Sequence, residues 1–231
     1  MDDSFTIKLL EWDSAFFNKR IGQLNIEQNA TVIKNANDFD LIQAKVLTTN
    51  YHKIDLLNQL NFNLVEGELD FSLNISSAKY DENLLTIQLA TPSDIQQIKT
   101  VVDNSFNASR YRKPWFSEPQ RNQFYQLWAE KAVQGTFDDL CILIKDNKNI
   151  KGFVTLKLSG NTARIGLICV NSNFHGQGVA TTLLKQAVMY SQNKNCEQVY
   201  VTTQLANSSA IALYTKFGFT INTISYWFYK T

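Results

Sequence analysis

The sequence predicts an α/β protein. Its sheet is expected to be mixed, as in α+β proteins, and to carry helices on its faces. Three observations lead to this fold class. Three strand-like segments follow one another through short turns between residues 140 and 170, which favours antiparallel pairing. Helix-like and strand-like segments then alternate from residue 178 to residue 230, which favours a parallel crossover. The first 80 residues hold a shorter set of such segments, which predicts an additional, smaller α/β domain.

Composition and charge exclude several classes of protein. The chain has 231 residues, 44% of them hydrophobic, and a formal net charge of +1, so we expect a globular core and no nucleic-acid partner. Its apolar runs are far shorter than the roughly 20 residues that a membrane helix needs. Two His and three scattered Cys form no ligand cluster, so no metal site is expected. Without a positively charged leader segment, the sequence predicts a cytoplasmic protein.

The larger predicted domain covers residues 84–231. Its run 91–94, Thr-Pro-Ser-Asp, is typical of a helix start, and apolar residues follow at helical spacing as far as Phe106. Gly135 is expected to lie just past a second helix. The predicted elements are, in order, a strand at 84–89, helices from 91 and at 118–134, strands at 140–145, 151–158 and 163–170, a helix at 178–192, a strand at 198–203, a helix at 208–217 and a strand at 219–230.

The smaller predicted domain covers residues 1–80 and precedes a linker at Tyr80–Asn83. Its predicted elements are a strand at 20–26, helices at 38–45 and 55–60, and a strand at 64–73. The segment Asp55–Phe62 is similar to Ala212–Phe219, since each indicates a helix, a tight turn, a Phe and a long strand. Two interpretations stay open: a degenerate partial copy of the larger domain, or the general likeness of helix–turn–strand units.

A glycine-containing loop follows the strand that ends at Val170. The run 175–180, His-Gly-Gln-Gly-Val-Ala, leads directly into a helix, whose unpaired N–H groups and partial positive charge favour a pyrophosphate. The loop lacks the P-loop motif and the third glycine of the dinucleotide fingerprint. A tight strand-to-helix turn without a ligand is the alternative.

A second motif supports a ligand at that loop. The spacing Asn207-x-x-Ala-x-x-x-Tyr214-x-x-x-Gly-Phe, about 30 residues after the loop, resembles the GNAT superfamily of acyl-CoA-dependent N-acyltransferases. The loop resembles their Arg/Gln-x-x-Gly-x-Gly/Ala motif, with His175 in place of Arg or Gln. The resemblance implies a GNAT fold and acetyl-CoA as co-substrate. The residues that it implies for acetyl-CoA binding are Ile168, Cys169, Val170, His175, Gly176, Gln177, Gly178, Val179, Ala180, Asn207 and Leu213.

Motifs outside this region narrow the resemblance to GNAT enzymes that acetylate nucleotide-linked amino sugars. They are the runs at 12–17, 64–70, 109–116, 136–138, 203–207 and 226–229. This resemblance implies a nucleotide-sugar acceptor, to whose site the smaller domain contributes, a role in making a surface glycan, and a homodimer. One alternative is a GNAT enzyme with another acceptor, either a nucleotide-linked amino sugar other than the one the resemblance implies or a peptide N-terminus. The other alternative is an acetyl-CoA sensor without catalytic activity.

The implied chemistry assigns roles to particular residues. Tyr214 is the expected proton donor to the leaving thiolate, because a phenol with a pKa near 10 is protonated at neutral pH; a core tyrosine is the alternative. The resemblance implies direct transfer, with a backbone N–H near Ile168 or Cys169 facing the oxyanion. Cys169 has no accompanying base in a motif, so it is not expected to be a nucleophile. Glu68 is the expected base. The alternative is that it is a surface or hydrogen-bonding glutamate without a catalytic role.

The acceptor site is predicted from a basic and aromatic segment at 109–116. Arg110 and Arg112 suit a diphosphate, and the rings of Tyr111 and Trp115 suit a thymine base. A solvated loop is the alternative for this basic and aromatic segment. Phe17 is a candidate for the sugar pocket and equally for the core.

Overall fold

The computed structural model describes residues 4–26, 30, 32–76, 86–103, 105–147 and 149–231. The chain divides into two compact units. The first unit consists of residues 1–69, 204–206 and 223–231, and the second unit of residues 70–203 and 207–222. The linker predicted at Tyr80–Asn83 lies outside the described residues, so the division into domains at 80–84 stays a prediction.

The second unit contains most of the elements predicted for residues 84–231. They are β7 (Gln88–Leu89), the 3₁₀ turn η3 (Pro92–Asp94), α3 (Ile95–Val102), α4 (Glu118–Val133), β8 (Leu140–Asp146), β9 (Asn149–Ser159), β10 (Thr162–Val170), the 3₁₀ turn η4 (Ser172–Phe174), α5 (Val179–Asn193), β11 (Gln198–Gln204), α6 (Ser208–Phe217) and the start of β12 (Thr220–Lys230). The second half of β6 (Asn63–Asn74) also belongs to this unit.

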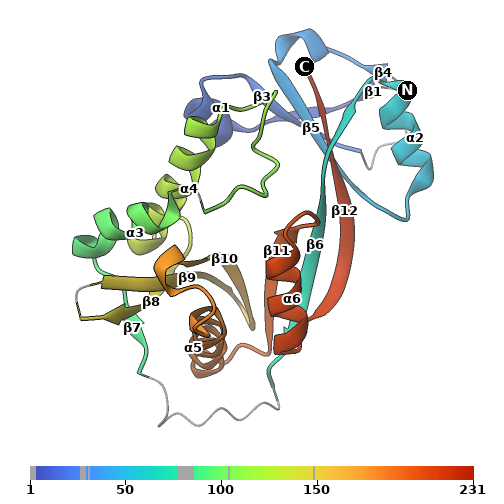
Figure 1. Ribbon diagram of the computed structural model, residues 1–231. Helices are drawn as coiled ribbons and strands as arrows, with labels where there is room; N and C mark the ends of the chain where they lie inside the picture. Colours follow the sequence, from blue (N-terminus) through green and yellow to red (C-terminus); the bar gives the residue numbers. More distant parts are fainter. Residues whose placement is uncertain (1–3, 27–29, 31, 77–85, 104, 148) are drawn as a thin grey trace. The chain divides into compact units, whose positions relative to one another are not determined.

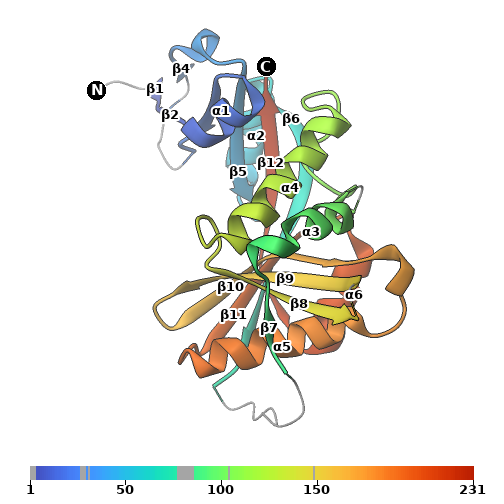
Figure 2. The same cartoon turned by 90° about the vertical axis from the view of Figure 1, so that its left-hand side faces the viewer.

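The sheet of the second unit is mixed, as predicted. Its strand order is β6-β11-β10-β9-β8-β7. The strands β7 to β10 pair antiparallel, with short turns between β8 and β9 and between β9 and β10, whereas β10 and β11 are parallel and are connected through α5. The helices α3 and α4 lie on one side of β8 and β9, and α5 lies on the other side (Figure 2).

Local sequence signals place the first two helices of this unit. The backbone N–H of Thr91 donates a hydrogen bond of 2.9 Å to the Asp94 carboxylate, and the two residues form a capping box. Ser117 and Gln120 form a second capping box at the start of α4. Gly135 follows α4 with a φ of +67°, as expected for a residue past a helix end. The helix α3 ends at Val102, so Phe106 lies beyond it.

The first unit contains shorter elements. They are β1 (Ser4–Phe5), β2 (Ile7–Leu9), α1 (Glu11–Phe17), β3 (Ile21–Leu24), β4 (Val32–Ile33), the 3₁₀ turn η1 (Ala36–Asp38), β5 (Leu41–Leu47), α2 (Tyr51–Gln59), the first half of β6 and most of β12. Its main sheet has the order β2-β3-β5-β12-β6. Leu57 of α2 packs with Ile42, Ala44 and Phe228 of β5 and β12, beside which α2 lies in Figure 1.

One predicted helix of the first unit is wrong. Residues 38–45 were expected to be helical, but Leu41–Leu47 form the strand β5, which pairs with β3 and β12. The residues 41–44 are all buried, so both faces of this strand are covered and the period of two is lost. An apolar run of this kind fits a buried strand as well as a helix.

The likeness between the two helix–turn–strand segments extends further than the sequence indicated. Asn50 and Asn207 cap α2 and α6, each by accepting a hydrogen bond from the backbone N–H three residues later. Asn61 and Gly218 both have positive φ after these helices. One constant sequence offset relates these pairs and also aligns β5 with β11 and β6 with β12. The matches favour a repeated unit over a chance likeness.

Candidate active site

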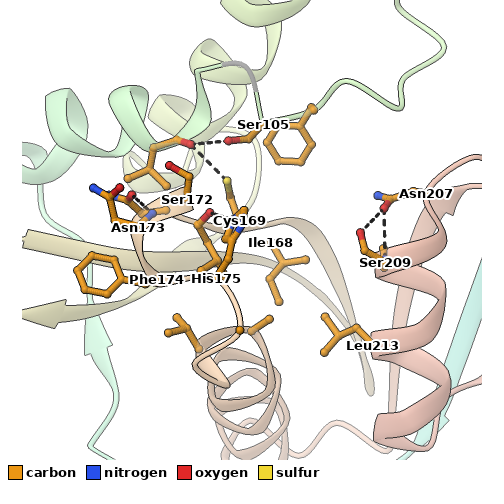
Figure 3. Close-up of a pocket in the computed structure, with 18 of the residues that line it drawn as sticks. Ser105, Ile168, Cys169, Ser172, Asn173, Phe174, His175, Asn207, Ser209 and Leu213 are labelled. Carbon is orange, nitrogen blue, oxygen red and sulfur yellow. Dashed lines mark hydrogen bonds between the residues drawn. The ribbon is translucent and has the colours of Figure 1, made fainter.

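The second unit contains a pocket of about 1030 Å³. It lies where the end of β10, the loop before α5 and the helix α6 come together, opposite the segment that follows α3 (Figure 3). The predicted site residues that line it are Ile168, Cys169, Val170, His175, Gly176, Gly178, Val179, Ala180, Asn207, Leu213 and Tyr214. The structure therefore brings together, in one cavity, the residues of both motifs.

A divergence of strands opens the pocket. The parallel pairing of β10 with β11 extends from Thr162 to Ile165, and among the described residues β10 has no β11 partner beyond that point. The pairing of β10 with β9 shifts register between Ile165 and Ile168 and then continues to Val170. Backbone groups at the end of β10 on the β11 side are thus left for a ligand.

The loop between β10 and α5 is shaped by glycines in a left-handed conformation. Gly176 and Gly178 have φ values of +74° and +76°, which other residues rarely adopt. The Nε2 atom of His175 makes a hydrogen bond of 3.0 Å to the carbonyl oxygen of Val170, which ties the loop to β10. No side chain caps the first turn of α5. Its N–H groups and positive dipole end thus suit a phosphate.

Tyr214 combines a buried ring with a pocket position. The residue is 3% exposed, and its ring lies 5.6 Å from that of Phe71 and 5.7 Å from that of Phe219. Among the described residues, its hydroxyl has no hydrogen-bond partner. Burial raises the pKa of the Tyr214 phenol above its ordinary value of 10, so the hydroxyl keeps its proton at neutral pH. It can therefore donate a proton into the pocket.

Cys169 lines the pocket as a protonated thiol. Its Sγ atom donates to the carbonyl oxygen of Val101 over 3.4 Å, and the hydroxyl of Ser105 donates to the same oxygen over 2.7 Å (Figure 3). Burial raises the pKa of Cys169 to about 11. A thiol with this pKa supplies very little thiolate at neutral pH, which agrees with the expectation that Cys169 is not a nucleophile.

The opposite wall of the pocket was missed from the sequence. It comes from the end of α3 and the segment after it, with Asp103, Phe106 and Asn107 among its residues. The helix α4 braces this wall: Asn122 donates to Asp103 over 3.2 Å, and Arg121 donates to Asn107 over 2.9 Å. An irregular segment has no periodicity to reveal such residues; the polar run between two helices was the one available signal.

Other predicted residues lie outside this pocket. The guanidinium of Arg110 donates to the hydroxyl of Tyr111 over 2.7 Å and stacks on its ring, and Arg112 lies over the ring of Trp115. Gln177 donates to a loop carbonyl and does not line the cavity. The roles of Arg110, Tyr111, Arg112 and Trp115 in acceptor binding, and of Gln177 in acetyl-CoA binding, stay predictions.

Glu68 and Phe17 belong to the first unit. Glu68 is 7% exposed and lies on β6, where one carboxylate oxygen accepts a hydrogen bond from Lys45 and the other accepts one of 2.7 Å from the indole N–H of Trp227. Lys45 also lies over the Trp227 ring. Phe17 is 3% exposed at the end of α1. Glu68 is thus a hydrogen-bonded glutamate, and its role as a base stays a prediction.

The described residues include neither a candidate metal centre nor a candidate membrane-spanning helix. No group of three or more His, Cys, Asp or Glu side chains within them could hold a metal ion. No helix in this part of the chain is both long and apolar enough to cross a membrane.

Comparison with known proteins gave consistent results. The model of the acetyltransferase (GNAT) family matches residues 104–219. The chain is 31% identical over 229 residues to the dTDP-fucosamine acetyltransferase of Escherichia coli O6:H1, which covers 97% of this chain and 98% of that protein. It is 25% identical over 200 residues to the spore coat polysaccharide biosynthesis protein SpsD of Bacillus subtilis, or 85% of this chain and 68% of that protein.

A solved structure agrees with the fold. A GCN5-related N-acetyltransferase from Sphaerobacter thermophilus matches with a TM-score of 0.60 at 15% identity. The match covers 82% of this chain but 59% of the length of that one. At this identity the likeness concerns the fold alone.

Proposed function

The chain belongs to the acetyltransferase (GNAT) family, and on this premise we propose that it moves an acetyl group from acetyl-CoA to the 4-amine of dTDP-4-amino-4,6-dideoxy-D-galactose. The observation that carries the proposal is the similarity to a dTDP-fucosamine acetyltransferase along almost the whole chain, first unit included. A role in the synthesis of a surface glycan goes with this acceptor, as do the expected homodimer and cytoplasmic location, which stay predictions.

The pocket fits acetyl-CoA. The uncapped first turn of α5 and the glycines at 176 and 178 suit the pyrophosphate, because backbone N–H groups can approach it without a side chain between them. The unpaired edge of β10 near Ile168 suits the pantetheine arm and the acetyl group. Leu213 projects from α6 toward this space (Figure 3) and supplies an apolar contact.

Direct transfer uses three groups of the chain. The acceptor amine is protonated at neutral pH, and Glu68, directly or through water, takes up a proton before the amine attacks the thioester carbonyl. The N–H of Ile168 or Cys169 donates to the oxyanion that forms. When the tetrahedral intermediate breaks, the Tyr214 hydroxyl gives its proton to the departing CoA thiolate, and the second proton of the attacking nitrogen returns to the tyrosinate as the amide forms. No covalent bond to the chain forms at any step.

The test is the release of CoA thiol from acetyl-CoA in the presence of three acceptors: dTDP-4-amino-4,6-dideoxygalactose, its gluco epimer and a 3-amino isomer. We expect rapid release with the galacto compound and much slower release with the other two. Rapid release with an isomer alone, or with a peptide N-terminus, would change the acceptor and keep the acetyl transfer. Tight acetyl-CoA binding without transfer to any amine would favour a sensor.

A further inference from the structure

A β-bulge lies immediately before the part of β10 that lines the pocket. Ile165 pairs with Leu156 of β9 and Ile168 pairs with Val154, so three steps along β10 correspond to two along β9. The extra residue falls at Gly166–Leu167. A bulge of this kind bends its strand and changes the direction of the backbone groups that follow. Here those groups are the N–H groups at Ile168–Val170.

A chain of buried hydrogen bonds holds this bulge. The N–H of Leu167 donates over 2.8 Å to the hydroxyl oxygen of Thr155, which lies on β9 and is fully buried. The Thr155 hydroxyl in turn donates to Oδ2 of Asp138 over 2.5 Å. The indole N–H of Trp128, on α4, donates to the same oxygen over 2.8 Å. Asp138 is 4% exposed and therefore depends on these donors.

The glycine in the bulge leaves room for this carboxylate. A Cβ atom at Gly166 would lie 2.2 Å from Oδ2 of Asp138 and 2.9 Å from the Thr155 hydroxyl oxygen. The carboxylate thus lies directly against the bulge backbone. Burial raises the pKa of Asp138, and the donors Thr155 and Trp128 partly offset that effect. Hydrogen bonds thus link α4 to β10 through the side chains of Trp128, Asp138 and Thr155 and the backbone N–H of Leu167.

We propose that Thr155 and Asp138 are positioning residues for acetyl transfer, because they fix the bulge at Gly166–Leu167 and so set the direction in which the N–H of Ile168 or Cys169 points toward the acetyl carbonyl. The inference rests on the proposed function, in which one of these N–H groups donates to the oxyanion. Donors of that kind act only at the correct distance and angle. A bulge that relaxes moves them without removing the site for the nucleotide part of acetyl-CoA.

The first test compares Thr155→Val with Thr155→Ser. Valine has the same shape but can neither accept from Leu167 nor donate to Asp138, whereas serine keeps the hydroxyl. We expect Thr155→Val to lower kcat by about 10- to 100-fold. This decrease does not exceed the one that removal of an oxyanion donor causes. The KM and Kd for acetyl-CoA should change less than about threefold, and Thr155→Ser should recover most of kcat. Asp138→Asn keeps an acceptor oxygen and should exceed Asp138→Ala in kcat.

Ser191→Ala is the matched control. Ser191 is also fully buried, and its hydroxyl donates to the carbonyl oxygen of Ala187 within α5, away from the pocket. This variant should lose stability but keep kcat. If Thr155→Val lowers kcat no more than Ser191→Ala, or raises KM and lowers kcat together, the positioning role is wrong.

A second readout does not depend on the acceptor. Hydrogen exchange of the Leu167 amide, measured in the free protein, should become at least about tenfold faster in Thr155→Val and return to the wild-type rate in Thr155→Ser. An unchanged rate in Thr155→Val would contradict the proposed hydrogen-bond chain. Inactive wild-type protein with all three sugars would instead contradict the proposed function, since the exchange result is independent of substrate.

Discussion

Tyr214 is the residue in which packing and chemistry can be separated most cleanly. Its ring packs against Phe71 and Phe219, while its hydroxyl makes no hydrogen bond to a described group. Tyr214→Phe keeps the packing and removes the proton donor, so we expect kcat to fall about 100-fold or more. The acetyl-CoA Kd and the unfolding temperature should barely change. Steady-state kinetics with calorimetry measure these quantities.

Tyr190→Phe is the control, because Tyr190 lies on α5 and does not line the pocket. An unchanged kcat in Tyr214→Phe would show that another group protonates the thiolate. The pH profile adds a check. Since burial raises the pKa of Tyr214 above 10, deprotonation of this phenol should not reduce wild-type kcat between pH 6 and pH 9.

The residues of the site differ in how well the sequence predicts them. Tyr214 and Asn207 were predicted because the motif that contains them resembles that of GNAT enzymes, and both residues line the pocket. Asp103 and Asn107 were missed because they follow the end of α3, where no periodic pattern relates a residue to its neighbours. Spacing within an element can be predicted from sequence, whereas contacts between irregular segments depend on the complete fold.

At the scale of the element, the start of α5 depends on the backbone conformation of its glycines. Gly178 has a φ of +76°, and a Cβ atom there would meet nothing within 4 Å. Gly178→Ala therefore has a conformational cost of about 1 kcal/mol and no steric clash. We expect the loop to relax toward negative φ and the acetyl-CoA Kd, measured by calorimetry, to rise about tenfold.

Gly160→Ala controls for the backbone cost. Gly160 lies in the β9–β10 turn with a φ of +56°, and a Cβ atom there also has no neighbour within 4 Å. Both variants should lose similar stability, but Gly160→Ala should keep the wild-type Kd. Equal Kd values in the two variants would mean that the loop conformation does not matter for binding.

The start of α3 predicts a dependence of stability on pH. Burial alone would raise the pKa of Asp94, but the ion pair with Lys145 and the hydrogen bonds from Thr91 outweigh it, so the pKa is lowered. The contribution of Asp94 is thus present above its unfolded pKa near 3.8 and is lost as the pH falls through the lower folded value. Asp94→Asn should lower the free energy of unfolding by about 1 kcal/mol at pH 7.

Urea titrations at pH 7 and at pH 3 measure the difference in free energy of unfolding between Asp94→Asn and the wild type. This difference should be smaller at pH 3. Asp103→Asn is the control at the other end of α3, because its carboxylate accepts from the neutral side chain of Asn122. A difference between Asp94→Asn and wild type that is as large at pH 3 as at pH 7 would contradict the sign of the pKa shift.

Elements were predicted well where a local signal marks their ends. The capping residues at 91–94 and the glycine at 135 located α3 and α4, and the short turns located β8 to β10. The strand β5 was mistaken for a helix because both of its faces are buried, which hides the period of two. The helix α1 was missed: it starts after Leu10, which offers no side-chain cap. Whether both faces of a strand such as β5 are buried depends on the rest of the fold, so the sequence of the strand alone does not predict it.

At the scale of the whole molecule, the repeat explains which features belong to the fold and which to the chemistry. The two units share the Asn cap and the turn residue with positive φ. At the position equivalent to Tyr214, however, the first unit has Leu57, which is fully buried. The repeat therefore retains the features that stabilise a helix–turn–strand segment and lacks the proton donor.

This comparison makes Asn50 a matched control for Asn207. Each side chain caps a helix by accepting from a backbone N–H at 3.2 Å, so Asn50→Ala and Asn207→Ala should each lower the free energy of unfolding by about 1 kcal/mol. Only Asn207 lines the pocket. Asn207→Ala should therefore raise the acetyl-CoA Kd about three- to tenfold, as expected for one lost hydrogen bond, while Asn50→Ala keeps it. If both variants bind acetyl-CoA as the wild type does, Asn207 only caps its helix, as Asn50 does, and contributes nothing to the affinity for acetyl-CoA.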